Sequence, residues 1–92
     1  MKIEKSLSIS ITGKVQGVGF RYFVRQQASD QKLTGWVKNN MDGSVEILAT
    51  GPADKLEAFI SQIKKGPQGS RIDNFFFSWI RTQNKVKDFK IL

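Results

Sequence analysis

Hydrophobic and polar residues alternate near the start of the chain as they do in a strand with one buried face. Leu7, Ile9 and Ile11 are separated by serines, so a period of two puts the three apolar side chains on one side. After a glycine-rich stretch at 13–19, apolar residues recur at helical spacing, at Phe20, Phe23, Val24 and Ala28. The pattern predicts a strand, a tight loop and a helix in succession.

Two more strands are predicted on either side of a turn. Residues 33–39 are a short segment with Trp36 and Val37 at its centre, and the Asp42-Gly43 pair that follows is a strong hairpin signal. Beyond the turn the apolar positions alternate again, with Val45, Ile47 and Ala49 on the face opposite Glu46 and Leu48. Two antiparallel strands are therefore expected after the first helix.

A second helix is marked at both ends between residues 52 and 66. Pro52 suits the first helical position, Asp54 suits the first turn, and Gly66 follows two lysines that suit the last turn. Its apolar stripe has the spacing of a core-facing surface and consists of Leu56, Phe59, Ile60 and Ile63.

Two strands are predicted in the last third of the chain. Residues 70–81 are rich in aromatic and β-branched residues, with Phe75, Phe77 and Trp79 on one side and Phe76 and Ile80 on the other. One side must expose aromatic surface or be covered, and an outward Phe76 would mark a contact or an aggregation-prone strand. Residues 86–92 are predicted to form a short closing strand.

The predicted order is βαββαβ with a short extra C-terminal strand. Two helices can then pack on one face of a mainly antiparallel sheet, which is the α+β, ferredoxin-like two-layer arrangement. With 92 residues the chain is expected to be a single domain, residues 1–92. Many functions occur on this fold, so function has to be argued from a site.

The composition excludes several kinds of chemistry. The chain has no cysteine and no histidine, so it offers no disulfide, no thiol nucleophile, no imidazole base and no zinc site. The sequence therefore predicts neither a metal nor a cofactor. A hydrophobic content of 39% without a long apolar run, and an N-terminus without a signal-peptide block, lead us to expect a cytoplasmic protein.

The formal net charge of +7 predicts attraction to anions: nucleic acid, an acidic membrane surface or small phosphorylated molecules. Charge alone does not choose among them. Many of the cations come late in the chain and are expected to form a solvated surface, namely Lys64, Lys65, Arg71, Arg81, Lys85, Lys87 and Lys90.

The loop GKVQGVGFR, residues 13–21, has the features of an anion site. A loop that runs from a strand into a helix directs backbone N–H groups and the positive helix end toward one point. Glycines at 13, 17 and 19 permit left-handed conformations and keep side chains away from a ligand, and Arg21 could add a forked pair of hydrogen bonds to a phosphate. A glycine-rich turn beside an exposed arginine is the alternative that the loop alone leaves open.

The same stretch superficially matches two nucleotide-related motifs. It is not a Walker loop, and Tyr22 stands where a dinucleotide fingerprint has its third glycine. GVGFRYF also looks like the aromatic signature of an RNA-recognition motif, but there the aromatic residues lie on the third strand of the sheet. Here they enter a helix, where Phe20 and Phe23 fit a buried stripe.

Asn39 is the second candidate site residue. It ends the predicted second strand, and the fold can return that position to the start of the first helix. A neutral amide can hold a water molecule without titrating. Alternatively, Asn39 and Asn40 simply belong to the turn, which asparagine favours.

Taken together, GKVQGVGFR at 13–21 and GWVKNNMDGSVEILATG at 35–51 resemble the paired signature of the acylphosphatase family. The resemblance implies a ferredoxin-like enzyme that hydrolyses the carboxyl–phosphate bond of small acyl phosphates without a metal. It also implies that Arg21 binds the phosphate and Asn39 positions the attacking water. A backbone cradle for the phosphate would come from Val15, Gln16, Gly17, Val18, Gly19 and Phe20.

The resemblance further implies that the partner is a small acyl phosphate. A monomer is the default expectation, and no specific nucleic acid and no membrane are expected as partners. Two alternatives remain at this point. One is a ferredoxin-like binding module that uses its positive charge to hold nucleic acid or a partner. The other is the acylphosphatase-like domain that begins larger hydrogenase-maturation proteins, although the zinc-finger cysteines that follow there are missing here, which favours a free-standing enzyme.

Overall fold

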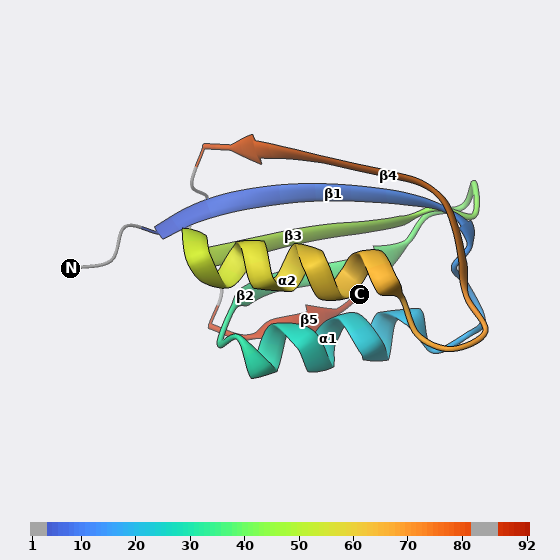
Figure 1. Ribbon diagram of the computed structural model, residues 1–92, viewed down its shortest axis with the longest axis horizontal. Coiled ribbons are helices and arrows are strands. Elements are labelled where there is room, and N and C mark those ends of the chain that lie inside the picture. The colour runs from blue at the N-terminus through green and yellow to red at the C-terminus, as the bar shows by residue number, and fades with distance from the viewer. Residues whose placement is uncertain (1–3, 82–86) are drawn as a thin grey trace.

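Five strands and two helices make up the computed structural model, which describes residues 4–81 and 87–92 (Figure 1). Their bounds are β1 Glu4–Lys14, α1 Phe20–Asp30, β2 Thr34–Asn39, β3 Val45–Pro52, α2 Ala53–Lys65, β4 Arg71–Ile80 and β5 Phe89–Ile91. The closing strand is shorter than predicted, and Val86 of that prediction, like Lys85, lies outside the described residues. Neither helix is long and apolar enough to cross a membrane.

The strands form one sheet in the order β4-β1-β3-β2-β5. Only the β2–β5 pair is parallel, and the other three pairs are antiparallel. Both helices lie on the same face of the sheet (Figure 1). The predicted ferredoxin-like α+β arrangement with two layers is confirmed.

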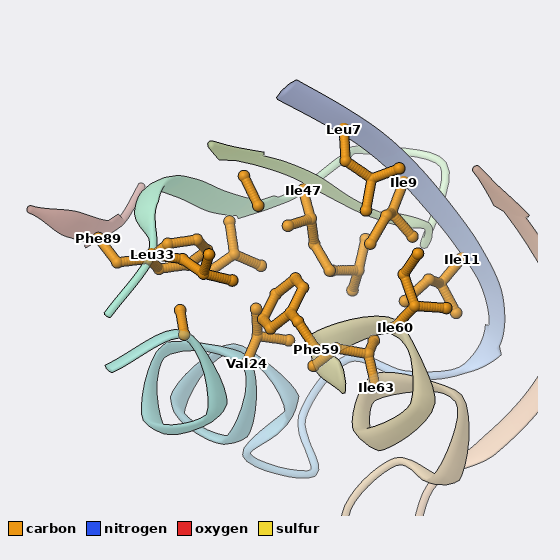
Figure 2. Close-up of a cluster of buried hydrophobic side chains, with 14 of the residues drawn as sticks. Leu7, Ile9, Ile11, Val24, Leu33, Ile47, Phe59, Ile60, Ile63 and Phe89 are labelled. Atoms are coloured by element: carbon orange, nitrogen blue, oxygen red, sulfur yellow. The ribbon is translucent and has the colours of Figure 1, made fainter. Parts of the chain in front are cut away.

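The core lies between that face and the two helices. Leu7, Ile9 and Ile11 of β1 are fully buried, and Figure 2 shows them directed toward Phe59, Ile60 and Ile63 of α2. Each fully buried side chain of this size stabilises the fold by about 1.5–3 kcal/mol relative to an exposed one. On β3 the predicted alternation also holds, because Val45, Ile47 and Ala49 are buried while Glu46 and Leu48 are partly exposed.

One prediction about α2 is wrong by a residue. Pro52 is the N-cap of the helix and the last residue of β3, with the extended dihedrals φ −62° and ψ 144°. It therefore precedes the first helical residue instead of occupying that position. Its fixed φ suits an extended strand as well as a helix start, so sequence alone did not distinguish the two.

Strand β4 is an edge strand whose helix-side aromatic residues are incompletely covered. The register sets Phe75, Phe77 and Trp79 opposite Ile11, Ile9 and Leu7. Phe75 packs against the core, but Phe77 and Trp79 remain 44% and 45% exposed, and Phe76 on the other face is 63% exposed. The expectation that one side of this strand exposes aromatic surface is confirmed for both sides.

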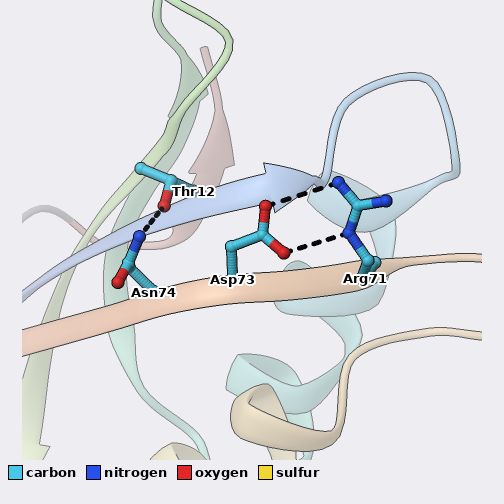
Figure 3. Close-up of polar contacts among 4 residues, drawn as sticks. All are labelled: Thr12, Arg71, Asp73 and Asn74. Atoms are coloured by element: carbon cyan, nitrogen blue, oxygen red, sulfur yellow. Dashed lines mark hydrogen bonds and ion pairs between the residues drawn. The ribbon is translucent and has the colours of Figure 1, made fainter.

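Asn74 of β4 is linked to β1 where the register shifts between Thr12 and Gly13, and an ion pair within β4 lies nearby. Figure 3 shows Asn74 Nδ2 donating to Thr12 Oγ1 at 3.0 Å, and Arg71 Nε donating to Asp73 Oδ1 at 3.0 Å. Gly13 has a φ of 131°, and a Cβ on it would lie 2.1 Å from the carbonyl oxygen of Arg71. This glycine clears room for β4, and not for a ligand as its place in the glycine-rich loop predicts.

We expect Gly13→Ala to destabilise the protein more than Gly69→Ala. Both glycines have positive φ, at 131° and 89°, and left-handed backbone costs an L-residue about 1–2 kcal/mol. Only at position 13 would the new methyl group also meet backbone, because nothing lies within 4 Å of a Cβ at position 69. Urea unfolding of both variants measures the difference, and equal losses would contradict the packing role of Gly13.

Candidate active site

The loop between β1 and α1 turns on two glycines. Gly17 and Gly19 both have a φ of 75°, and nothing lies within 4 Å of a Cβ built on either. They are therefore required for their left-handed backbone and not for close packing. Gly19 is also the N-cap of α1 and brings the chain directly into the helix.

The N-terminus of α1 keeps its positive character. No side chain caps it, and its first turn contains no acidic residue, whereas the first turn of α2 contains Asp54. The free N–H groups and the helix dipole favour an anion at this end. Arg21, the second residue of the helix, adds a full positive charge beside them.

A cavity of about 120 Å³ lies at this helix end. Its lining residues come from the loop, the first turn of α1 and the end of β2, and they are Val15, Gln16, Gly17, Gly19, Phe20, Arg21, Tyr22 and Asn39. The structure thus brings Arg21 and Asn39 to one cavity. Of the residues expected there, Val18 alone is not part of the lining and packs against the core instead, while Tyr22 was not expected.

Two of the lining residues belong to the core as much as to the cavity. The side chains of Val15 and Phe20 are 0% and 2% exposed. Their side chains anchor the loop in the core, so the polar groups that they can offer to the cavity are those of the backbone. A larger depression of about 440 Å³ lies at the other end of the sheet, where Pro52 is the N-cap of α2, but its lining contains two carboxylates beside its two lysines, and the first turn of that helix contains Asp54.

The guanidinium of Arg21 is held from outside its own helix. Its Nη1 donates to the carbonyl oxygen of Leu92 at 3.1 Å, and the Leu92 N–H donates to the carbonyl of Val37 at 2.8 Å. Arg21 and Leu92 are 71 positions apart. One guanidinium edge is therefore anchored at the β2–β5 side of the sheet, and no sequence signal could have revealed this contact.

Asn39 has a buried acceptor without a partner. Its Oδ1 makes no hydrogen bond within the described part of the chain, although the atom is shielded from solvent. Such an unpaired buried group costs about 1–3 kcal/mol, so the position favours a donor that the described residues do not supply. Asn40 behaves differently, because its Nδ2 donates to Ser44 Oγ at 3.0 Å and its N–H to the Ser44 carbonyl at 2.8 Å. The turn interpretation thus fits Asn40 and not the Asn39 side chain.

Gln16 links the glycine loop to the β2–β3 hairpin. Its Nε2 donates to the carbonyl oxygens of Asn40 and Ser44, at 2.9 Å each. Both amide hydrogens are used in this link. The position of Asn39 relative to Arg21 therefore depends on the Gln16 side chain, whereas the sequence predicts only a backbone role for this residue.

Asp42 stabilises the tip of the same hairpin. Its Oδ1 accepts from Ser44 Oγ at 2.6 Å and from the Ser44 N–H at 2.9 Å. These two hydrogen bonds, the side-chain one first, hold the pKa of Asp42 below its ordinary value of 3.8. The ionised carboxylate is therefore the form that the folded hairpin favours.

This sheet topology, with a glycine loop, an open helix N-terminus and an arginine around one small cavity, defines a ferredoxin-like protein with a cationic cavity at one end of its sheet. The chain belongs to the acylphosphatase family, whose sequence profile it matches over residues 7–91.

Individual relatives agree over nearly the whole chain. An acylphosphatase of Bacillus subtilis (strain 168) is 53% identical over 84 residues, which cover 91% of this chain and 92% of the relative. One from Salinibacter ruber is 42% identical and covers 96% and 93%. The chain thus has the extent of these relatives.

Solved structures show the same similarity. An acylphosphatase from Coxiella burnetii superposes with a TM-score of 0.91 at 35% identity, over 97% of this chain and 93% of that one. Full-length HypF in its phosphate- and nucleotide-bound form gives a TM-score of 0.93 at 39% identity, over all of this chain but only 12% of that one. The same domain therefore also occurs inside a much longer protein.

Asp42→Ala is expected to lower the urea midpoint at neutral pH. Because folding depresses the pKa of Asp42, the carboxylate contributes stability above pH 3.8 that disappears as the pH falls through its lower folded pKa. The difference between wild type and variant should accordingly shrink below pH 3.8. Glu57→Ala, which removes an exposed carboxylate from α2, is the control, and a difference that stays constant down to pH 2 would contradict the role of the ionised Asp42.

Gln16→Ala is expected to weaken phosphate binding and to lower turnover by roughly tenfold. The relative positions of Arg21 and Asn39 depend on the link between loop and hairpin, and misplaced catalytic groups reduce rates steeply. Gln16→Glu should not rescue either property, since a carboxylate cannot donate to two carbonyls. Titration calorimetry with inorganic phosphate and steady-state kinetics measure the two effects. Gln26→Ala, which removes an exposed glutamine of α1, is the matched control, and identical results for Gln16→Ala and Gln26→Ala would contradict the link.

Proposed function

We propose that this protein hydrolyses the carboxyl–phosphate bond of small acyl phosphates to a carboxylate and inorganic phosphate, using Arg21 to bind the phosphate and Asn39 to position the water. The proposal rests on the observation that the N-terminus of α1, Arg21 and Asn39 surround one cavity in a member of the acylphosphatase family, and that the Asn39 amide oxygen has no partner within the described residues.

Phosphate binding in this proposal combines backbone and side-chain donors. The residues from Val15 to Phe20, apart from Val18, line the cavity at the N-terminus of α1, and their backbone N–H groups and the helix dipole would act on the phosphate. Arg21 contributes the guanidinium N–H groups that Leu92 does not use. The negative charge of a phosphoryl group is spread over its oxygens, so several donors arranged in advance stabilise it better than one point charge.

Water attack would be organised by the amide of Asn39. A water that donates one hydrogen to Oδ1 satisfies the orphaned acceptor and turns its oxygen toward the phosphorus. The new P–O bond forms as the bond from phosphorus to the acyl oxygen breaks, and the carboxylate leaves with the electron pair. The proton of the water passes to a phosphoryl oxygen, so inorganic phosphate carries it away.

This chemistry suits a chain without histidine or cysteine. A carboxylate is a good leaving group, so the reaction needs little acid assistance, and positioning and charge stabilisation supply the catalysis. The proposal therefore includes a reaction that requires no metal. No cluster of three or more potential metal ligands occurs in residues 4–81 and 87–92.

We further propose that residues 1–92 act as one acylphosphatase-like domain, that the enzyme works as a monomer with no nucleic-acid or membrane partner, and that it is cytoplasmic.

Hydrolysis of benzoyl phosphate in EDTA, followed by ultraviolet absorbance, tests the proposal. Arg21→Ala and Asn39→Ala should each lower turnover by roughly 10² or more, as removal of one positioned polar group does in other catalytic sites. Arg21→Lys should remain poor because an ammonium cannot reproduce the guanidinium fork. The matched controls are Arg71→Ala and Asn74→Ala on β4, which should retain activity.

Circular dichroism first establishes that each variant is folded. Near-normal activity in a folded Arg21→Ala or Asn39→Ala protein would remove the corresponding role. A folded wild type that is no faster than buffer would reject the reaction itself.

A further inference from the structure

An exposed aromatic side chain follows Arg21 on α1. Tyr22 is 64% exposed and lines the cavity. Core packing does not explain its position. Nothing in the phosphate chemistry above uses it, although it lines the cavity that would hold the phosphate.

The size of the cavity determines where an acyl group must go. At about 120 Å³ the cavity is smaller than the ~150 Å³ that holds a benzene molecule. A phosphate group bound at the loop would fill most of this volume. A bulky acyl group would then extend toward the open side of the cavity, where exposed side chains can contact it.

Tyr22 is the large exposed side chain of the cavity lining. Val15 and Phe20 are buried, two other positions are glycines, and the remaining side chains, those of Gln16, Arg21 and Asn39, are half-buried and polar. Side chains on a helix lean toward its N-terminus, and Tyr22 is the third residue of α1. Its ring is thus directed toward the end of the helix where the cavity opens.

The ring of Tyr22 is also held in place. The Arg25 guanidinium carbon lies 5.3 Å from its centroid, a cation–π arrangement that covers one face. The rest of the ring stays available, consistent with its exposure. An aromatic surface oriented in advance loses little entropy when it contacts a ligand.

We propose that Tyr22 forms a subsite for the acyl group and makes the enzyme favour acyl phosphates with aromatic or bulky apolar acyl groups over acetyl phosphate. This inference rests on the proposed function and deepens it. The acyl group lies outside the reacting centre, so the contact is equally strong in ground and transition states and acts mainly on KM.

The test compares kcat/KM for benzoyl phosphate and acetyl phosphate in wild type, Tyr22→Ala and Tyr22→Phe. Tyr22→Ala should lower the value for benzoyl phosphate about 3- to 10-fold through KM, the range expected from losing one aromatic contact, with acetyl phosphate changed less than about twofold. Tyr22→Phe should behave as wild type. Comparing the ratio of the two kcat/KM values between wild type and variant cancels the intrinsic difference in reactivity of the two substrates.

Trp79→Ala is the matched control, since Trp79 on β4 is exposed and has Lys5 Nζ 5.5 Å from its ring in the same kind of cation–π pair. It should leave the substrate ratio unchanged.

An unchanged substrate ratio in Tyr22→Ala would overturn the subsite, whether the two values stay the same or fall equally, and whether or not Arg25→Gln changes the ratio. A wild type that hydrolyses neither substrate would reject the proposed function and the subsite with it, and this outcome is visible before any variant is made. A wild type active on both with an unresponsive ratio rejects the subsite alone.

Discussion

The burial of one face of β1 is the interaction on which the remaining structure depends. β1 pairs with β3 on one side and β4 on the other, and its three apolar side chains are completely removed from water. The strand then runs past β4 at Gly13 and turns through two left-handed glycines into α1. Because the core holds both ends of the loop, namely β1 and the buried Phe20, the backbone N–H groups at the cavity are positioned without help from a ligand.

Two different segments supply the positive charge and the neutral hydrogen-bond acceptor of the cavity. The loop and α1 supply positive potential, through the uncapped helix end and Arg21, whereas the β2–β3 hairpin supplies the neutral acceptor of Asn39. Gln16 joins the two segments through backbone carbonyls. An amide acceptor beside a cation does not neutralise it, so an anion keeps the full attraction of the site while a water can still be oriented.

Sequence patterns predicted the elements well because the signals involved are local. Alternation located β1 and β3, helical spacing located α1 and α2, and Asp42-Gly43 located the hairpin. The errors occurred where one local signal permits two outcomes. Pro52 suits both a strand end and a helix start, and Gly13 suits both a ligand site and a close strand contact. Only the close contact with β4 shows that Gly13 serves strand packing.

The sequence by itself therefore determined the order of elements, the apolar faces, the glycine turn and the family to which the two motifs point. The tertiary structure alone decided that the Asn39 oxygen is unpaired while Asn40 completes the turn, that Gln16 spans to the hairpin, that Leu92 anchors Arg21 and that Tyr22 stands at the mouth of the cavity. The reason is physical: periodicity and backbone preference act over a few residues, whereas these contacts join positions up to 71 residues apart that meet only when the sheet and helices pack.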